Sequence, residues 1–261
     1  MCPAQIPLPT SLPRAALVTG AARRVGRAVA LDLAERGFAV AVHYSRSAAE
    51  AEAVVAEIET KGGRAVALRA DLTREEEVAT LVDRAVQALG PLGVLVNNAS
   101  VFERDDALSA DRASWDLHLE VNLRAPFVLT QSLARQLPAE ADAVVINLLD
   151  QRVWNLTPHF TSYTLSKAGL WTLTQTLALA LAPRIRVVAI GPGPALPSSR
   201  QSDGQFAAQV GALPLRRGTS PAEICRTVGF LLATPSVTGQ MIALDGGQHL
   251  SWAAGDTQPE E

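Results

Sequence analysis

The sequence predicts an α/β fold in which a single doubly wound, mostly parallel seven-stranded sheet carries helices on both faces. Short apolar runs alternate with longer amphipathic segments along nearly the whole chain, which is the pattern of repeated strand–helix units. The run 143–149 is almost uninterrupted in its apolar character, as expected of a strand covered by helices on both faces. Because crossovers between parallel strands are right-handed, such units wind a sheet in both directions.

The expected elements follow one another in a regular order. Strands are expected at 17–19, 38–44, 64–70, 93–97, 143–149, 185–190 and 241–244. Helices are expected at 24–36, 48–61, 74–89, 115–137, 160–182 and 221–233. The segment 191–214, rich in Pro and Gly, is the one long stretch expected to be irregular. Ligands of such folds bind at the carboxyl ends of the strands, and this segment follows a strand. We therefore interpret residues 192–215 as a lid over the substrate; a disordered surface loop is the alternative.

Length and composition fit one large domain. With 261 residues, of which 48% are apolar, the chain can bury a substantial core. The length alone would also allow two small domains, but no linker or repeat divides the sequence. We therefore expect one domain at 14–252. A loose, Pro-containing arm at 1–13 without the apolar stretch of a signal peptide precedes it, and a polar tail at 253–261 follows it.

Charge and cysteine content argue against several classes of function. The net charge is only −3 at pH 7, so we expect no general attraction to nucleic acid or to an anionic membrane. No apolar run approaches the roughly 20 residues of a membrane span. Cys2 and Cys225 cannot form a disulfide framework and lack metal-ligand spacing. We expect no metal site and a location in the reducing cytoplasm.

The turn after the first strand has the features of a phosphate-binding site. In Thr19-Gly20-Ala21-Ala22-Arg23-Arg24-Val25-Gly26, the first glycine permits a sharp turn and the second lets a helix start close to the sheet. The helix N-terminus offers free N–H groups and a positive dipole end to a pyrophosphate. Such a pattern is weak alone and gains weight from its place at the first strand–helix turn. Cofactor contacts are expected from Gly20, Arg23, Arg24, Val25 and Gly26.

The end of the second expected strand favours NADPH over NADH. The segment His43-Tyr44-Ser45-Arg46-Ser47 contains no carboxylate, although NAD-preferring enzymes commonly place one there for the ribose 2′-OH. A guanidinium can bind a phosphate through two parallel hydrogen bonds, and a hydroxyl adds a donor. We expect Arg46 and Ser47 at the 2′-phosphate, with His43, Tyr44 and Ser45 beside the cofactor. Taken alone, His43 fits a packed core histidine better.

A tyrosine and a lysine on one predicted helix form the candidate catalytic group. Tyr163 and Lys167 are four residues apart, so they share a helix face. A positive charge close to a phenol favours its ionised form, which suits a proton donor working near neutral pH. Asp150 directly follows the apolar run 143–149, where an isolated carboxylate is costly unless it is paired or hydrated. A second, plainer role for Asp150 is to cap the loop that follows it.

The Tyr-x-x-x-Lys pair and the glycine turn together resemble the short-chain dehydrogenase/reductase family. Further matches follow in the family's order from about residue 14 to 249: Asn97-Asn98-Ala99, Asn122, Gly191-Pro192-Gly193 and Leu244-Asp245-Gly246-Gly247. The resemblance implies a Rossmann-like fold and an oxidoreductase. It also implies that Asn122 anchors a proton-relay water and that Lys167 holds the nicotinamide ribose. Further implied cofactor contacts are Asp71, Leu72, Asn98, Ala99, Ser100, Tyr163, Gly191, Pro192 and Gly193.

Within that family the chain resembles the pteridine reductases. Most members have Ser where this chain has Asp150, and Gly where it has Arg24, whereas the pteridine reductases share the Asp thirteen positions before the Tyr. Asn-Asn-Ala-Ser followed by an aromatic residue, here Ser100 and Phe102, is also similar. The resemblance implies that Asp150 and Tyr163 deliver a proton to a ring nitrogen while NADPH delivers hydride to carbon, and that Phe102 stacks on the pterin. Further implied substrate contacts are Arg24, Ser100, Pro194 and Leu196.

Three functions remain open at this point. The leading one is an NADPH-dependent pteridine reductase acting on dihydromonapterin, dihydrobiopterin or a dihydrofolate-like compound. The second is a generic NADPH-dependent carbonyl reductase for ketones or 3-oxoacyl thioesters, and the third is a non-catalytic NADPH-binding regulatory protein. Relatives of this fold usually form tetramers through their two long helices, so a homotetramer through 115–137 and 160–182 is also implied; a core-only role for that face is the alternative.

Overall fold

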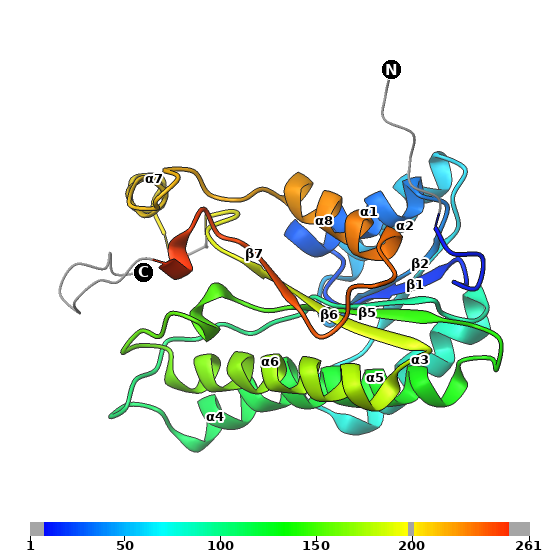
Figure 1. Ribbon diagram of the computed structural model, residues 1–261, viewed down its shortest axis with the longest axis horizontal. Helices are drawn as coiled ribbons and strands as arrows, with labels where there is room; N and C mark the ends of the chain where they lie inside the picture. The colour runs from blue at the N-terminus through cyan, green and yellow to red at the C-terminus, as the bar shows by residue number, and fades with distance from the viewer. Residues whose placement is uncertain (1–7, 198–200, 251–261) are drawn as a thin grey trace.

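One sheet of seven parallel strands runs through the molecule (Figure 1). The computed structural model describes residues 8–197 and 201–250. The strands are β1 (Ala15–Val18), β2 (Ala39–Tyr44), β3 (Ala65–Arg69), β4 (Val94–Asn97), β5 (Ala143–Leu148), β6 (Ile185–Pro192) and β7 (Met241–Leu244). Their order is β3-β2-β1-β4-β5-β6-β7, and every neighbouring pair is parallel. The doubly wound sheet predicted from the sequence is therefore confirmed, and it is parallel throughout.

Helices cover both faces of this sheet. One face carries α1 (Arg24–Glu35), α2 (Ala48–Thr60) and α8 (Pro221–Ala233). The other carries α3 (Glu75–Leu89), α4 (Arg112–Leu119), α5 (Ala125–Gln136) and α6 (Thr161–Leu181) (Figure 1). None of the described helices is long and apolar enough to span a bilayer. Three expectations fall partly or wholly outside the described residues: the arm up to residue 7, the tail at 253–261, and positions 198–200 of the lid.

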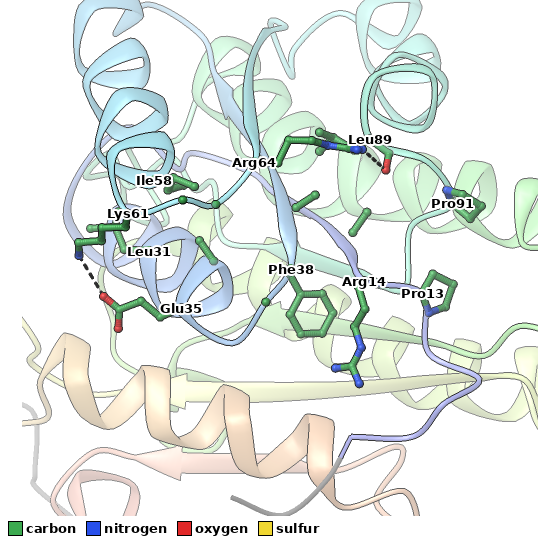
Figure 2. A pocket seen from close by; sticks show the side chains of 16 residues that line it. Pro13, Arg14, Leu31, Glu35, Phe38, Ile58, Lys61, Arg64, Leu89 and Pro91 are labelled. Atoms are coloured by element: carbon green, nitrogen blue, oxygen red, sulfur yellow. Dashed lines mark hydrogen bonds and ion pairs between the residues drawn. The ribbon is translucent and has the colours of Figure 1, made fainter.

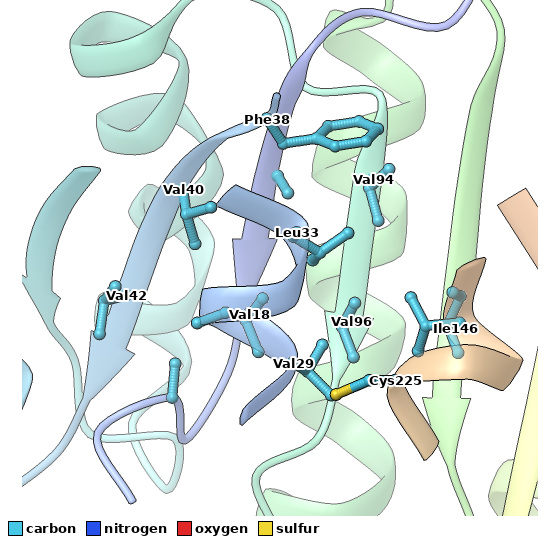
Figure 3. Close-up of a cluster of buried hydrophobic side chains, with 14 of the residues drawn as sticks. Val18, Val29, Leu33, Phe38, Val40, Val42, Val94, Val96, Ile146 and Cys225 are labelled. Carbon is cyan, nitrogen blue, oxygen red and sulfur yellow. The ribbon is translucent and has the colours of Figure 1, made fainter. Parts of the chain in front are cut away.

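Two apolar clusters fill the space between the sheet and its helices. Side chains alternate along a strand, so Val18 of β1 faces one cluster and Leu17 faces the other. Figure 3 shows the first cluster, where β-branched strand residues meet Val29 and Leu33 of α1 and Cys225 of α8. Burial of each such side chain contributes about 1.5–3 kcal/mol. The polar ends of the central strands are therefore held by a rigid, two-sided core.

The expected helix at 115–137 is interrupted. α4 ends at Leu119, a π-helical turn occupies Glu120–Arg124, and α5 begins at Ala125. Pro126 lies at the start of α5 and has no N–H, so the α-helical hydrogen bond that it would donate to the carbonyl of Asn122 cannot form. Instead, the N–H of Ala125 donates to the carbonyl of Glu120, one residue further back. Asn122 lies in this widened turn, where it is fully buried.

The expectation of an irregular segment over 191–214 is also wrong in part. A helix, α7 (Asp203–Gly211), forms inside it. Ser202 accepts a hydrogen bond from the N–H of Gln205, and the Gln205 side chain accepts one from the N–H of Ser202, which is a capping box. The helix forms with this cap although it contains Gly204 and Gly211, residues that disfavour helices. In Figure 1, α7 stands apart from both helical layers, next to the end of β7.

Candidate active site

A cavity of about 230 Å³ opens at the carboxyl ends of the central strands. Tyr163, Asp150 and Phe102 line it. The rest of the lining includes lid residues and Arg24 and Val25 of the phosphate turn. Of the residues expected from the sequence, nine line the cavity: Arg24, Val25, Phe102, Asp150, Tyr163, Pro192, Gly193, Pro194 and Leu196. These nine residues, which come from separate sequence motifs, therefore lie around one cavity.

Asp150 and Tyr163 are in direct contact. Asp150 is the second residue after the carboxyl end of β5, and Tyr163 lies in the first turn of α6. The phenol O–H donates to Oδ2 of Asp150 at 2.9 Å, and the backbone N–H of Arg152 donates to Oδ1 at 2.8 Å. The guanidinium Nε of Arg152 lies 3.9 Å from Oδ2. Both oxygens of the carboxylate are therefore hydrogen-bonded. This pairing offsets the cost of placing a charge directly after the apolar strand β5.

Asp150 also caps the short helix Gln151–Val153 through the bond from Arg152 N–H. The two roles considered for this residue are thus not exclusive. One oxygen shapes the loop, and the other faces the phenol. A single carboxylate therefore fixes both the loop that lines the cavity and the position of the Tyr163 hydroxyl.

Lys167 is fully enclosed one helical turn after Tyr163. Its side-chain Nζ donates to the carbonyl of Leu148 at 2.8 Å and lies 5.8 Å from the centre of the Tyr163 ring. Burial lowers the pKa of Lys167 to about 8, while the charge of Asp150 acts in the opposite direction. The ammonium therefore loses its proton at a lower pH than an exposed lysine does.

Asn122 fixes the position of the loop after β4. Its side-chain Oδ1 accepts from the N–H of Val101 at 2.9 Å, and its Nδ2 donates to the carbonyl of Val101 and to Oγ of Ser166, both at 3.0 Å. Ser166 lies on α6 between Tyr163 and Lys167. The amide of Asn122 therefore joins the π-helical turn, the loop and the catalytic helix.

The phosphate turn is held by residues that the turn pattern alone does not reveal. Gly20 has a φ of 62°, and its N–H donates to Nδ1 of His43 at 3.0 Å. The hydroxyl of Thr19 accepts hydrogen bonds from the N–H groups of Asn98 and Ala99. A Cβ at Gly26 would lie 2.2 Å from the carbonyl oxygen of Gly20. The turn and the start of α1 can approach each other this closely only because residue 26 is glycine.

The buried side chain of His43 fixes the backbone of this turn through a hydrogen bond. Its ring is buried, with Nδ1 accepting from Gly20 and Nε2 lying 3.1 Å from the carbonyl of Ala70. Burial lowers the pKa of His43 to about 4, so the ring is neutral and donates from Nε2. The structure places His43 in the core beneath the turn, in line with the core interpretation of this residue.

The adjacent surface carries Arg46 and Ser47. Arg46 is exposed at the end of β2, and Ser47 precedes α2 as its N-cap residue. Asp71, at the end of β3, has a lowered pKa, first because it accepts hydrogen bonds from Thr73 and also because Arg46 is near. Leu72 beside it is buried. Together with Tyr44 and Ser45, these residues lie at the carboxyl ends of β2 and β3, next to the phosphate turn that follows β1.

Arg24 links the phosphate turn to the lid. Its backbone has a φ of 51°, a left-handed conformation that is uncommon for a residue with a side chain. Its guanidinium donates to the carbonyls of Pro197 at 2.9 Å and Leu196 at 3.2 Å. The same residue thus faces the cavity and ties the start of the lid to α1.

Aromatic rings form one wall of the cavity. Phe102 stacks on Phe160 with centroids 4.3 Å apart and meets the edge of Tyr163 at 4.7 Å. The guanidinium of Arg152 lies over both phenylalanine rings, at 5.4 Å and 4.8 Å. Phe102 is therefore a wall residue and not simple core. Gln151 and Arg152 also line the cavity, and Phe160 packs against Phe102. No sequence motif pointed to these three residues, although the first two directly follow Asp150.

A larger cavity, of about 670 Å³, lies at the amino ends of the strands. Figure 2 shows Arg14, Phe38, Lys61 and Arg64 around it, with Lys61 paired to Glu35. None of the expected site residues lines it. In parallel sheets of this kind, ligands bind at the carboxyl ends of the strands, so size alone does not make this the functional site. Among the described residues, no group of His, Cys, Asp or Glu could hold a metal ion.

Comparison with known proteins shows the family. Residues 14–206 match the family model described as short chain dehydrogenase. A 3-oxoacyl-[acyl-carrier-protein] reductase FabG of Staphylococcus epidermidis is 35% identical over 242 residues, which cover 91% of this chain and 99% of that protein. The chain therefore belongs to the short-chain dehydrogenase family, as its motifs predicted, and it is an oxidoreductase.

Two solved structures are more similar still. The FolM alternative dihydrofolate reductase 1 from Brucella canis, complexed with NADP, is 48% identical, with a TM-score of 0.91 over 96% of this chain and 100% of that one. The FolM alternative dihydrofolate reductase 1 from Brucella suis, also in complex with NADP, is 51% identical, with a TM-score of 0.89 over 92% of this chain and 97% of that one. The likeness thus extends to a particular branch of the family.

Proposed function

We propose that this protein is an NADPH-dependent pteridine reductase that converts a dihydropterin, such as dihydromonapterin, dihydrobiopterin or dihydrofolate, into its tetrahydro form. The observation that carries the proposal is the hydrogen bond from the Tyr163 hydroxyl to Asp150 at 2.9 Å. Reduction of a ring C=N bond adds hydride to carbon and a proton to nitrogen. A phenol backed by a carboxylate can supply that proton and be reprotonated through the carboxylate.

The cofactor side of the site fits NADPH. A Cβ on Gly26 would fill the space between the turn and α1, so the glycine leaves the helix N-terminus open to a pyrophosphate. The exposure of Arg46, the hydroxyl of Ser47 and the lack of a carboxylate between residues 43 and 47 support contact of these two side chains with a 2′-phosphate. When bound, NADPH supplies the hydride. The two FolM structures, both with NADP, support this choice.

The residues expected from the sequence take distinct roles in this proposal. Tyr163 donates the proton, Asp150 holds and replenishes it, and Lys167 binds the nicotinamide ribose while its charge favours the ionised phenol. Asn122 anchors the relay water, Phe102 stacks on the pterin, and Arg24 and Ser100 bind the pterin edge. The remaining contacts to the cofactor are those expected from the family positions, among them Asp71, Leu72, Asn98, Ala99, Gly191, Pro192 and Gly193.

A 3-oxoacyl reductase is the second candidate, because a protein with that activity is 35% identical over most of the chain. The cavity lining speaks against it. Arg24, Arg152 and the amides of Gln151, Gln201 and Gln209 contribute polar groups that suit a heterocycle better than an acyl chain. A non-catalytic NADPH-binding protein is a third possibility, against which stands the assembled Tyr163–Asp150 pair.

A substrate panel distinguishes these functions. Dihydromonapterin, dihydrobiopterin, dihydrofolate and a simple β-ketoester are each mixed with protein and NADPH, and the loss of NADPH absorbance is followed. The proposal requires turnover of at least one dihydropterin that clearly exceeds turnover of the β-ketoester. Turnover of the β-ketoester alone would establish the second candidate, and NADPH binding without any oxidation would establish the third.

A homotetramer is part of the proposal. An apolar groove lined by Leu119, Leu123, Phe127 and Leu173 runs between the helices α4, α5 and α6 on the outer face of the molecule. Pairing of two copies along α5 and α6 would cover this groove. Light scattering of the purified protein should therefore give about four times the mass of one chain.

A further inference from the structure

Three buried polar side chains form a continuous chain behind the aromatic wall of the cavity. They are His118 of α4, Ser162 of α6 and Asp105 of the loop that follows β4, and each is at most 3% exposed. Nδ1 of His118 lies 2.7 Å from Oγ of Ser162, and that hydroxyl donates to Oδ2 of Asp105. Buried polar groups are costly unless all are paired, so a fully paired network of this kind fixes its members tightly.

The hydrogen-bond directions in this chain are determined. The backbone N–H of Glu103 donates to Nε2 of His118 at 3.0 Å, so Nε2 carries no proton and the neutral ring has its proton on Nδ1. Nδ1–H therefore donates to Ser162, whose hydroxyl passes its own hydrogen to Asp105. Burial lowers the pKa of His118, which favours this neutral form; Asp105, Glu103 and Tyr163 are the titratable groups around the ring.

His118 thus bridges the two walls of the cavity. On one side it binds the backbone of Glu103, the residue directly after Phe102. On the other it binds Ser162, the residue directly before Tyr163. One imidazole consequently sets the separation between the ring that would stack on the substrate and the phenol that would protonate it.

Asp105 completes the bridge by capping the catalytic helix from another segment. The residue before α6, Phe160, has a left-handed backbone with φ of 60° and makes no side-chain cap. Asp105 replaces that cap: Oδ1 accepts from the N–H of Ser162 at 3.2 Å, and its carbonyl accepts from the N–H of Phe160 at 2.6 Å. A carboxylate at a helix N-terminus is also favoured by the helix dipole.

We propose that His118, with Ser162 and Asp105, is a positioning residue that holds the Phe102 wall and the Tyr163 phenol in register, so that a ring stacked on Phe102 meets the phenol. The two nitrogens have separable duties. Nε2 places the stacking wall and so governs substrate binding, whereas Nδ1 places the catalytic helix and so governs the proton transfer. The assignment of these duties rests on the proposed pteridine reduction.

Two amide substitutions separate the nitrogens. The amide of His118→Asn can replace Nδ1 and keep the bond to Ser162 while releasing Glu103. The amide of His118→Gln can replace Nε2 and keep the bond to Glu103 while releasing Ser162. One lost hydrogen bond corresponds to about a tenfold effect. We expect the Asn variant to raise the KM for the dihydropterin about tenfold with a small change in kcat, and the Gln variant to lower kcat about tenfold with KM nearly retained.

Three measurements keep this test decisive. Both variants should fold, with an unfolding temperature a few degrees below that of the wild type because one buried hydrogen bond is lost. NADPH binding, followed by fluorescence, should match that of the wild type in both variants. Equal effects of both variants on kcat and KM, or no effect of either, would overturn the positioning role. Ser162→Ala is the smaller change and should reproduce the kcat loss of the Gln variant; if neither His118 variant folds, an unchanged kcat in Ser162→Ala overturns the proposal.

Failure of the proposed function has a different signature. A wild-type protein that reduces only the β-ketoester would refute pteridine reduction and with it the KM assignment of Nε2. The kcat assignment of Nδ1 would then be tested on the β-ketoester with the same two variants. An unaffected kcat in His118→Gln would overturn the bridge in that case too.

Discussion

The phosphate turn and the aromatic wall lie along the same edge of one sheet, but different interactions hold them. Around the turn, backbone groups and small residues dominate: Gly20 and Gly26 allow close approach, and one buried neutral histidine, His43, supports the backbone. Around the wall, side chains distant in sequence dominate: His118 and Ser162 are 44 residues apart, and Asp105 and Ser162 are 57 apart. Each region is built around a buried histidine, yet one histidine supports a turn and the other joins two walls.

This difference assigns cofactor binding to the turn and substrate choice to the wall. A turn defined by backbone geometry binds the part of a cofactor that is the same in every reaction. A wall defined by side-chain networks can be changed residue by residue, and Asp150 and Tyr163 lie beside that wall. The four substitutions below test this division between a cofactor region and a substrate region, in order of decreasing expected effect.

Tyr163→Phe should affect only the substrate region. It removes the hydroxyl that donates to Asp150, while the ring still packs against Phe102 at its edge. General acid catalysis commonly contributes about 10²–10⁴-fold, so kcat should fall by that order with NADPH affinity retained. Steady-state rates and fluorescence titration measure the two quantities. A parallel loss of NADPH affinity would show that the regions are not separable.

Lys167→Met should make the ligand-free protein more stable while abolishing turnover, because Lys167 lies where the regions meet. Its pKa is lowered from 10.5 to about 8 by burial, so the folded state binds this proton less strongly than the unfolded state does. Below pH 8 the buried charge destabilises the fold by up to roughly 3 kcal/mol, and this cost disappears as the pH rises from 8 to 10.5. Denaturant unfolding at pH 7 and pH 10 measures the difference between variant and wild type.

The advantage of the methionine variant should therefore be largest at pH 7 and shrink at pH 10. A variant less stable than the wild type at pH 7 would mean that the hydrogen bond from Lys167 to Leu148 outweighs the cost of burying the charge.

Arg46→Asp should affect only the cofactor region. The exposed guanidinium is replaced by a carboxylate, which repels a 2′-phosphate and can accept hydrogen bonds from a ribose 2′-OH. A charged hydrogen bond contributes about 1.5–3 kcal/mol, so the KM for NADPH should rise about 10- to 100-fold while that for NADH stays level or falls. Equal losses with both cofactors would refute the 2′-phosphate assignment.

Gly26→Ala tests the backbone character of the phosphate turn. The added Cβ would lie 2.2 Å from the Gly20 carbonyl oxygen and 2.5 Å from Nδ2 of Asn98, so the turn must shift. Overpacking of this kind costs about 1–3 kcal/mol, and NADPH affinity should fall with the unfolding temperature. Gly211→Ala is the matched control, since its Cβ would meet nothing within 4 Å. The turn account fails if the two variants behave alike.

Sequence patterns pointed to the backbone-defined features and to Asp150 acting with Tyr163, but they missed the other side-chain networks. Apolar runs gave the strands, and Gly20, Gly26 and the Tyr163–Lys167 spacing gave the edge of the site, because each is a local signal. The break at Glu120–Arg124 had a local signal too, Pro126, which should have divided the expected helix. α7 was missed because its capping box was overlooked in a segment rich in Pro and Gly.

The bridge through His118 could not be predicted in the same way. Its partners Glu103 and Ser162 are brought together only when α4, α6 and the loop after β4 pack against each other. Likewise, the bond from Arg24 to the lid carbonyls spans more than 170 residues. Such pairings depend on tertiary contacts that a single sequence does not reveal, and they are concentrated in the substrate region.

The central claim is that the carboxylate of Asp150 and the phenol of Tyr163 share one proton path to the substrate. Its most direct test is the rate of dihydropterin reduction by Asp150→Ser compared with the wild type, with β-ketoester reduction measured in parallel. We expect dihydropterin turnover to fall by about tenfold or more, while β-ketoester turnover is kept or gained. Dihydropterin reduction at the wild-type rate in this variant would contradict the claim.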